Sequence, residues 1–351
     1  MSKTFRARLA RAFAAGLALA AGLGSARAHA AEVVNVYTYR LPELIRPLLQ
    51  AFTKETGIKV NAVFAQEGLE ERMRAEGRNS PADLLITVDI GRLQQAVDMG
   101  LAQPVRSDAI ERNIPAAYRD PAGFWTGLSM RARVVYASRD RVKQDSITYE
   151  GLADPKWKGR LCTRSAQHVY NIGLIASLIV HHGEAWTERW LRDVKANLAR
   201  KPAGGDTDQA KAIYAGECDI ALGNTYYAGQ MATNERDPEQ KKWAAAIKVL
   251  FPNRGDRGTH VNVSGAVVAK FAPHRDNAVK LLEFLTTDEA QRLYADVNYE
   301  YPVNPDVKPS ELVRSWGELK PDPLPLAEIA KHRAKASELV DKVGFDQGPN
   351  S

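Results

Sequence analysis

Short apolar runs alternate with amphipathic segments through residues 33–99 of the chain. Residues 33–39 (VVNVYTY) and 58–64 (IKVNAVF) are rich in β-branched residues, which predicts strands. Residues 82–88 are almost continuously apolar, as expected for a strand of a parallel sheet covered on both faces. The segments between these strands have apolar residues at helical spacing, and a further helix is predicted around 90–99. This order predicts a β-α-β-α-β unit, an open doubly wound sheet.

The pattern becomes less regular in the rest of the chain. The pattern of residues 125–136 predicts an extended segment. The other predicted elements are helices at 186–198, 209–216, 276–285 and 287–296, and strands at 219–223 and 265–269. No internal repeat and no Gly/Ser-rich linker separates the two α/β halves. We therefore predict an α/β protein of two lobes that are joined by crossing strands, with a cleft between them.

The first thirty residues have the pattern of a secretion signal. A positive region with Arg6, Arg8 and Arg11 precedes a small or apolar stretch over 12–24, and Ala28-His29-Ala30 fits a small-x-small cleavage site. The apolar stretch is shorter than the about 20 residues that a membrane-spanning helix needs. We expect cleavage near Ala30 and export of a soluble mature chain to the periplasm without membrane insertion. The alternative is an uncleaved amphipathic N-terminal helix.

The net charge of +6 comes mostly from this N-terminal segment. Residues 1–30 contain five Lys and Arg and no acid, so the remainder is close to neutral. A near-neutral chain lacks the surplus of positive charge that nucleic-acid binding requires. The two cysteines, Cys162 and Cys218, exclude clusters that need four thiolates. In an oxidising compartment we expect them to pair, which would stabilise the fold by roughly 4 kcal/mol; two buried free thiols are the alternative.

The candidate chemistry lies in tyrosines that follow predicted strands. Tyr226 and Tyr227 come directly after the strand at 219–223, Tyr39 ends the first strand, and Tyr170 precedes an apolar segment. In open α/β sheets, ligands bind outside the carboxyl ends of strands, and a strand-to-helix corner can bring adjacent phenols together. A phenolate is a hard anionic oxygen donor and suits Fe(III) better than zinc or copper(I). The alternative for the adjacent pair is one core and one surface aromatic residue.

No enzyme motif accompanies these tyrosines. The sequence lacks Gly-x-Ser-x-Gly, His-Glu-x-x-His, a P-loop and the glycine fingerprint of dinucleotide binding. A Cys–His pair is excluded as a catalytic unit if Cys162 forms a disulfide. We therefore expect a binding protein and no enzyme.

Several strings resemble the periplasmic ferric-iron-binding proteins of ABC transporters. The resemblance extends from residue 33 to at least residue 304, nearly the whole mature chain, and the strings together make it specific. They are residues 36–40 (VYTYR), 53–61 (TKETGIKVN), 79–84 (NSPADL), 131–136 (RARVVY), 161–165 (LCTRS), 169–171 (VYN), 216–222 (GECDIAL) and 225–227 (TYY).

The resemblance implies the two-lobed type II periplasmic binding protein fold, similar to a transferrin lobe. It implies lobes of approximately 31–130 plus 253–303 and 131–252 plus 304–351. Such a monomer would close over one Fe(III), with a synergistic anion such as carbonate, and deliver the iron to an inner-membrane ABC permease.

The same resemblance assigns Tyr170, Tyr226 and Tyr227 as iron ligands. Some members add a His or Tyr in a Ser-Arg-His-Tyr setting after the first strand, where this chain has Tyr-Arg-Leu-Pro at 39–42. Two possibilities follow: Tyr39 is a further ligand, or anion and water complete a site of three tyrosines.

Two arginines in the matching strings are candidates for binding the anion. Arg40 and Arg131 could grip a planar oxyanion through paired hydrogen bonds, or each could pair with a carboxylate. Arg133 is expected to face away from Arg131 and is left out. A competing hypothesis keeps the fold and replaces iron with an organic or oxyanion solute, such as a polyamine, thiamine or a phosphonate.

Overall fold

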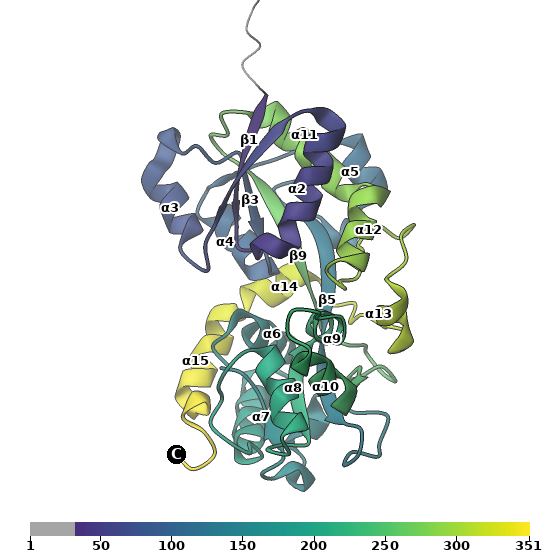
Figure 1. Cartoon of the computed structure of the whole chain (residues 1–351). Coiled ribbons are helices and arrows are strands. Elements are labelled where there is room, and N and C mark those ends of the chain that lie inside the picture. The colour runs from purple at the N-terminus through teal and green to yellow at the C-terminus, as the bar shows by residue number, and fades with distance from the viewer. Residues whose placement is uncertain (1–31) are drawn as a thin grey trace, which may run out of the picture. The chain divides into compact units, whose positions relative to one another are not determined.

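The β-strands join in one mixed sheet with the order β2-β1-β3-β9-β5-β7-β6, in a computed structural model that describes residues 32–351 (Figure 1). β4 pairs with β9, and β8 pairs with β5. The strands are β1 Val33–Thr38, β2 Lys59–Phe64, β3 Leu84–Thr87, β4 Ala102–Gln103, β5 Thr126–Ser138, β6 Leu161–Cys162, β7 Ile220–Asn224, β8 Ile247–Leu250 and β9 Val261–Ala269. The expected signal segment at 1–30 lies outside the described residues and stays a prediction.

Helices connect these strands and cover the sheet. They are α2 Pro42–Thr56, α3 Leu69–Glu76, α4 Ile90–Asp98, α5 Asp108–Asn113, α6 Val169–His182, α7 Glu184–Ala196, α8 Asp206–Tyr214, α9 Thr225–Ala232, α10 Glu239–Ala246, α11 Arg275–Thr286, α12 Asp288–Asp296, α13 Glu311–Ser315, α14 Leu326–Lys331 and α15 Arg333–Val343. Short 3₁₀ turns occupy Gly77–Asn79, Ala116–Tyr118, Glu150–Ala153, Pro155–Trp157 and Phe345–Gln347. Among residues 32–351, no helix is long and apolar enough to cross a bilayer.

The predicted β-α-β-α-β unit is confirmed. β1 runs parallel to both β2 and β3, and every residue of β3 is buried. Helix α2 buries Ile45, Leu48 and Phe52 in the core. It ends at Gly57, whose φ of 74° lies in the left-handed region that glycine adopts without a steric penalty.

A doubly wound sheet would be mostly parallel, and this expectation does not hold beyond β3. β9 runs antiparallel to β3 and to β5, and β5 runs antiparallel to β7 and β8. The thirteen residues of β5 are all buried. Its first half pairs with β9 and its second half with β7 and β8, so this strand runs from one half of the sheet to the other. The architecture is the mixed α/β, two-lobed fold expected for periplasmic binding proteins; the lobe boundaries stay a prediction.

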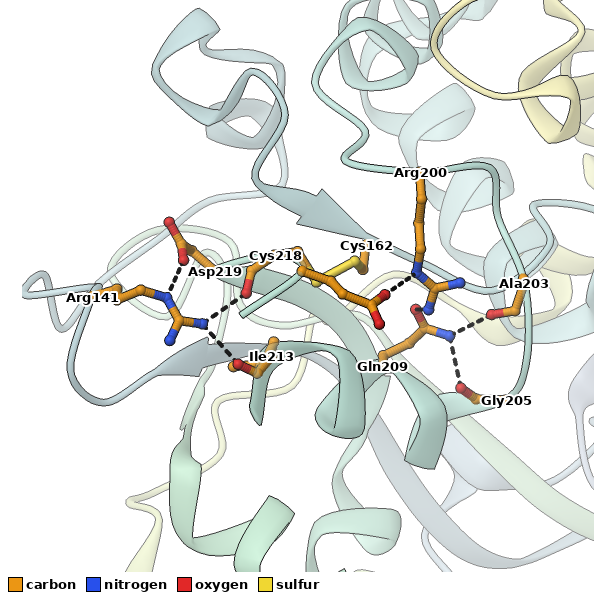
Figure 2. Close-up of a disulfide and its surroundings, with 10 residues drawn as sticks. Arg141, Cys162, Arg200, Ala203, Gly205, Gln209, Ile213, Cys218 and Asp219 are labelled. Atoms are coloured by element: carbon orange, nitrogen blue, oxygen red, sulfur yellow. Dashed lines mark hydrogen bonds and ion pairs between the residues drawn. A yellow bond between two sulfur atoms is a disulfide. The ribbon is translucent and has the colours of Figure 1, made fainter. Parts of the chain in front are cut away.

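The predicted disulfide is present. Cys162 and Cys218 are bonded, with their Cα atoms 5.9 Å apart, and both are buried (Figure 2). The bond links β6 to Cys218, which lies two residues before the first residue of β7. Arg141 donates to the carbonyl oxygens of Cys218 (2.9 Å) and Ile213 (2.8 Å), which holds the same corner from outside.

Candidate functional site

Three of the predicted tyrosines lie in the first turns of two helices. Tyr226 and Tyr227 belong to α9, which begins immediately after β7, and Tyr170 is the second residue of α6. The expected strand-to-helix corner at 224–227 is therefore confirmed. Backbone N–H groups at a helix N-terminus carry partial positive charge, so this placement favours negative charge on nearby groups.

The three side chains meet at one wall of a cleft of about 550 Å³. The hydroxyl oxygens of Tyr170 and Tyr226 are 3.1 Å apart. The ring centroids of Tyr226 and Tyr227 are 4.2 Å apart. Tyr226 is 6% exposed, while the other two are half-buried. Residues that are distant in sequence thus present three phenol groups to the same space.

Burial disfavours the ionised form of Tyr226 and Tyr227. It is the largest cause that raises the pKa of Tyr226 well above the ordinary value for a phenol, and the neighbouring Tyr170 and Tyr227 raise it further. The pKa of Tyr227 is also raised, first by burial and then by Tyr170 and Asp206. Phenols that are so close cannot all ionise unless a positive charge compensates them.

Tyr39 lines the same cleft, but its hydroxyl is already engaged. It donates to Glu70 and accepts from the backbone N–H of Leu69 at 2.7 Å. The guanidinium carbon of Arg92 lies 3.7 Å from the ring centroid. Burial, followed by the hydrogen bond to Glu70, raises the pKa of Tyr39. The structure does not join Tyr39 to the cluster of the other three.

Arg131 lies in the cleft wall, and two of its side-chain nitrogens make no hydrogen bond within the described chain. Its Nη2 donates to the Val88 carbonyl oxygen and to Ser264 Oγ (2.9 Å). Its Nε and Nη1 are buried and have no hydrogen-bond partner among residues 32–351, and Nε lies 4.0 Å from Glu300 Oε1, a long ion pair. The guanidinium carbon lies 5.9 Å from the ring centroid of Tyr170. Two donors on a fixed cation beside the tyrosines suit a small oxyanion.

Arg40, the second predicted anion contact, is paired with a carboxylate. Its Nη1 lies 2.9 Å from Glu300 Oε2, and its Nη2 donates to Ser129 (3.2 Å) and Ser264. Burial lowers the pKa of Arg40, but Glu300 and neighbouring tyrosines outweigh that cost, and the pKa is raised. Within the described residues, Nε is the one nitrogen of this buried side chain without a partner.

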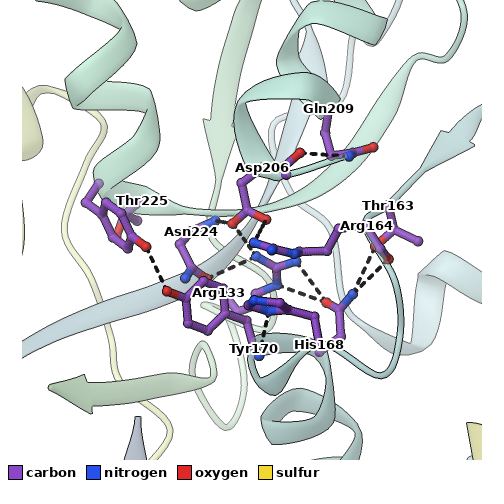
Figure 3. Close-up of polar contacts among 12 residues, drawn as sticks. Arg133, Thr163, Arg164, His168, Tyr170, Asp206, Gln209, Asn224 and Thr225 are labelled. Atoms are coloured by element: carbon purple, nitrogen blue, oxygen red, sulfur yellow. Dashed lines mark hydrogen bonds and ion pairs between the residues drawn. The ribbon is translucent and has the colours of Figure 1, made fainter. Parts of the chain in front are cut away.

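The expectation that Arg133 faces away from Arg131 is wrong. Side chains two residues apart on a strand share a face, and both arginines line a small cavity beside Tyr170. Arg133 Nη1 donates to Asp206 (2.6 Å), and Nε and Nη2 donate to the Asn171 side-chain oxygen (3.1 and 2.8 Å) (Figure 3). A further bond runs from Nη1 to the side chain of Asn224 at 3.1 Å.

Sequence reasoning also missed Asp206 and Arg164. Asp206 is fully buried at the start of α8, where it accepts from Arg133, from the backbone N–H of Asn224 (2.8 Å) and from Arg164 (3.3 Å). Burial opposes ionisation, but the two arginines outweigh it and lower the pKa of Asp206. Arg164 lines the cleft with its guanidinium carbon 5.4 Å from the Tyr170 ring centroid. The position of Arg164 in the string 161–165 could have pointed to it. The sequence around Asp206 indicates a helix start and gives no sign of its contacts with the arginines.

His168 caps the helix that carries Tyr170. Its Nδ1 accepts from the backbone N–H of Tyr170 at 3.3 Å, and its ring stands edge-on to the Tyr170 ring with centroids 4.5 Å apart. Burial first, and then Arg164, lowers the pKa of His168 to about 3. The imidazole is thus neutral near pH 7 and adds no charge. Among residues 32–351, no group of three or more His, Cys, Asp and Glu could hold a metal ion, so a metal site would have to use other donors.

Comparisons with known proteins agree with this architecture. Residues 40–292 match the family described as bacterial extracellular solute-binding protein. Iron uptake protein A1 of Synechocystis sp. is 45% identical over 314 residues, which cover 89% of this chain and 87% of that protein.

Two solved structures are similar over nearly their full lengths. The Bordetella ferric binding protein is 56% identical with a TM-score of 0.83, and the match covers 90% of this chain and 100% of that one. A Trichodesmium protein in complex with iron and citrate ligands is 41% identical with a TM-score of 0.84, covering 89% and 99%. The chain therefore belongs to the bacterial extracellular solute-binding proteins, and its resemblance to the ferric-iron-binding members is confirmed.

Proposed function

We propose that this chain is a periplasmic receptor that binds Fe(III) through the phenolates of Tyr170, Tyr226 and Tyr227 and passes it to an inner-membrane ABC permease. The observation that carries the proposal is the 3.1 Å separation of the Tyr170 and Tyr226 hydroxyls, with the ring of Tyr227 packed against that of Tyr226. The names of the iron uptake and ferric-binding relatives support the same ligand. The receptor acts as a monomer.

Charge and donor type both favour a trivalent ion as the cargo. Three phenolates balance the charge of Fe(III), and hard anionic oxygens suit it. Each tyrosine must lose its proton when iron binds, and the ion supplies the positive charge that the crowded phenols lack. The chain's own part is to hold the three oxygens together before iron arrives, which reduces the ordering needed on binding.

Arg131 is the residue proposed to bind the anion. Its guanidinium lies beside Tyr170, and its Nη1 has no partner in the described chain while Nε has only the long ion pair with Glu300. A carbonate or similar oxyanion bound there would complete the iron coordination and be neutralised by the guanidinium. The citrate in the Trichodesmium structure supports an anion as a companion of the iron. Arg40 offers this anion its Nε only, because Glu300 and two serines occupy its other nitrogens.

Tyr39 is proposed to stay outside the coordination sphere. Its use as a ligand would break its bonds with Glu70 and Leu69, and Glu70 is itself buried. Leaving a buried acid without its partner costs about 1–3 kcal/mol. The proposed site therefore has three tyrosines, with anion or water in the remaining positions.

The competing hypothesis of an organic or oxyanion solute is weaker. Arg92, Arg131 and Arg164 give the cleft a positive wall, which opposes a polyamine or thiamine. A phosphonate would suit the arginines but leaves the gathered phenols without a role. The phenol cluster therefore favours iron.

Replacement of single tyrosines tests the proposal. Tyr226→Phe and Tyr227→Phe each remove one donor oxygen and leave the rings in place, so Fe(III) affinity should fall by orders of magnitude while the fold is kept. Tyr301→Phe is the matched control, because Tyr301 is a buried phenol outside the cleft whose hydroxyl has no partner in the described chain. Titration with ferric iron against a competing chelator gives the affinities. Unchanged affinity in both site variants would exclude these tyrosines as ligands.

A further inference from the structure

A second cavity, of about 590 Å³, lies between helix α2 and the edge strand β2. Its floor is apolar, with Ile45 and Leu49 of α2 on one side and Val60, Ala62 and Phe64 of β2 on the other. β2 is the outermost strand of the sheet, and five of its six residues are exposed. Proteins usually cover or charge such an edge, so an open apolar groove beside it indicates a contact surface.

Three cations border the groove. Arg46, Lys54 and Lys59 are exposed and line it, and none of their side chains has a hydrogen-bond or ion-pair partner within residues 32–351. No Asp or Glu lines the groove. An apolar floor with an uncompensated positive rim suits a partner that presents apolar side chains between carboxylates.

The groove adjoins the cleft that holds the tyrosines. Phe64 lines both cavities, and Leu41 lines the cleft next to it. Leu41, Val63 and Phe64 are three of the six large apolar residues that are exposed in the described part of the chain. Of these, Leu41 and Phe64 line the cleft, and Phe64 also lines the groove, so exposed apolar surface lies between the two cavities.

We propose that this groove, between α2 and β2, is a docking surface for the ABC permease, which inserts a segment with apolar side chains flanked by Asp or Glu. The proposal rests on the transport function proposed above. A second copy of this chain is a poorer occupant, because a symmetric contact would oppose the same three cations. Residues 1–30 are a poorer occupant too, because they are basic and contain no acid. Because Phe64 belongs to both cavities, a docked segment would touch the cleft wall.

Charge reversal of the rim tests the docking surface. The triple variant Arg46→Glu, Lys54→Glu, Lys59→Glu reverses the charge of the rim. Its control is Lys143→Glu, Lys158→Glu, Arg189→Glu, which reverses three exposed cations on other parts of the chain. The side chains of these three cations also have no partner in the described chain. Ala62→Glu places one carboxylate in the groove itself. Iron-loaded receptor is titrated onto the permease reconstituted in liposomes, and ATP hydrolysis is followed. The iron content of each receptor variant is measured before the titration.

The rim variant should need roughly tenfold or more receptor for half-maximal stimulation, because like charges would meet across the contact. Ala62→Glu should act in the same direction, while the control triple and the iron content stay as in the unchanged protein. Equal half-maximal concentrations for the rim and control variants would overturn the proposal. So would a dimer of the unchanged receptor that the rim variant dissociates, measured by light scattering. If the unchanged receptor carries no iron, the proposed transport function is contradicted, whatever the docking measurement shows.

Discussion

At the scale of single residues, Arg133 fixes the position of the tyrosines without being one of their neighbours in sequence. It bonds to Asn171, which follows Tyr170, and to Asn224, which precedes the helix that carries Tyr226. One buried guanidinium therefore ties together the two chain segments that supply the phenols. Asp206 neutralises it and holds the backbone of Asn224 as well.

We expect Arg133→Lys to weaken iron binding by about 10- to 100-fold, the usual effect of losing a residue that orients metal ligands. Lysine keeps the charge but has one nitrogen in place of the three that bond Asn171, Asp206 and Asn224. Stability should fall by about 3 kcal/mol because buried polar groups lose their partners. Arg139→Lys is the control, since Arg139 donates to a carbonyl at the surface. Full iron affinity in the Arg133 variant, measured by chelator competition, would contradict this role.

Iron affinity should depend steeply on pH. Burial and neighbouring phenols raise the pKa of Tyr226 and Tyr227, so both are protonated near pH 7 before iron binds. Each ligand must then release a proton, and affinity should fall with decreasing pH by up to about three decades per unit for three tyrosines. Proton release measured in a pH-stat, corrected for the iron chelate used, should approach three per iron. A release near zero would mean that phenols are not the ligands.

At the residue scale, motifs marked the three tyrosines in the sequence, and their role as iron ligands stays a prediction. Tyr170, Tyr226 and Tyr227 were chosen from their strings, and they meet in one cleft. The interpretation of Arg133 failed because the two-residue period of a strand was misapplied. Asp206 could not have been found, because its partners come from three separate segments that only the tertiary structure brings together.

At the scale of elements, the corner between β7 and α9 controls where the paired tyrosines point. Gly223 of β7 packs against the ring of Tyr136 on β5, and Tyr136 donates to the carbonyl oxygen of Asn224. A Cβ atom at position 223 would lie 2.3 Å from the Tyr136 ring, closer than atoms can approach. A residue without a side chain is therefore required for this close contact.

We expect Gly223→Ala to displace the end of β7 and to lower stability by about 1–3 kcal/mol, as overpacking does. Iron affinity should fall with it, because Tyr226 and Tyr227 follow within four residues. Gly255→Ala provides the control, since a Cβ there meets no atom within 4 Å and the backbone is not left-handed. Thermal unfolding and iron titration measure both effects. If Gly223→Ala matches the control in stability and affinity, the corner does not position the tyrosines.

Local patterns predicted most elements but not their directions. Strands at 33–39, 58–64 and 82–88 and the helices between them are present because hydrophobic periodicity is a local signal. The antiparallel insertion of β9 between β3 and β5 is set by long-range pairing. No pattern within residues 265–269 distinguishes that direction from a parallel one.

At the scale of the whole molecule, buried histidines make stability depend on pH. His260 lies at the start of β9, donates its backbone N–H to Tyr149 (3.1 Å) and accepts from the backbone N–H of Arg133 (3.0 Å). Burial, reinforced by Arg133, lowers the pKa of His260 to about 3. The unfolded chain takes up a proton near pH 6.5, whereas the folded chain resists it.

The free energy of unfolding should therefore fall as pH decreases from about 6.5 to 3, by up to about 1.4 kcal/mol per pH unit for each such histidine. His168, whose pKa is also lowered to about 3, acts in the same direction. His260→Gln should reduce this slope, whereas His332→Gln, at a partly exposed site, should not. Urea unfolding at several pH values measures it. An identical slope in the His260 variant would rule out this source of acid sensitivity.

Whole-molecule properties were predictable where they followed from the hydrophobic pattern, the sequence resemblance or, for the disulfide, the expected export to an oxidising compartment. The α/β two-lobed fold and the disulfide between Cys162 and Cys218 are present. The lobe boundaries, the cleaved signal at 1–30 and the monomeric state stay predictions, because each depends on how the chain is processed or moves as a whole.

The central claim is that three phenolates hold Fe(III), and one measurement tests it most directly. Protein purified without added metal is analysed for metal content, and its visible absorption spectrum is recorded before and after addition of ferric iron. The account predicts one iron per chain and a phenolate-to-iron charge-transfer band that is weaker in Tyr226→Phe at the same ferric iron concentration. A protein that stays colourless with saturating ferric iron, or that binds iron without this band, would contradict it.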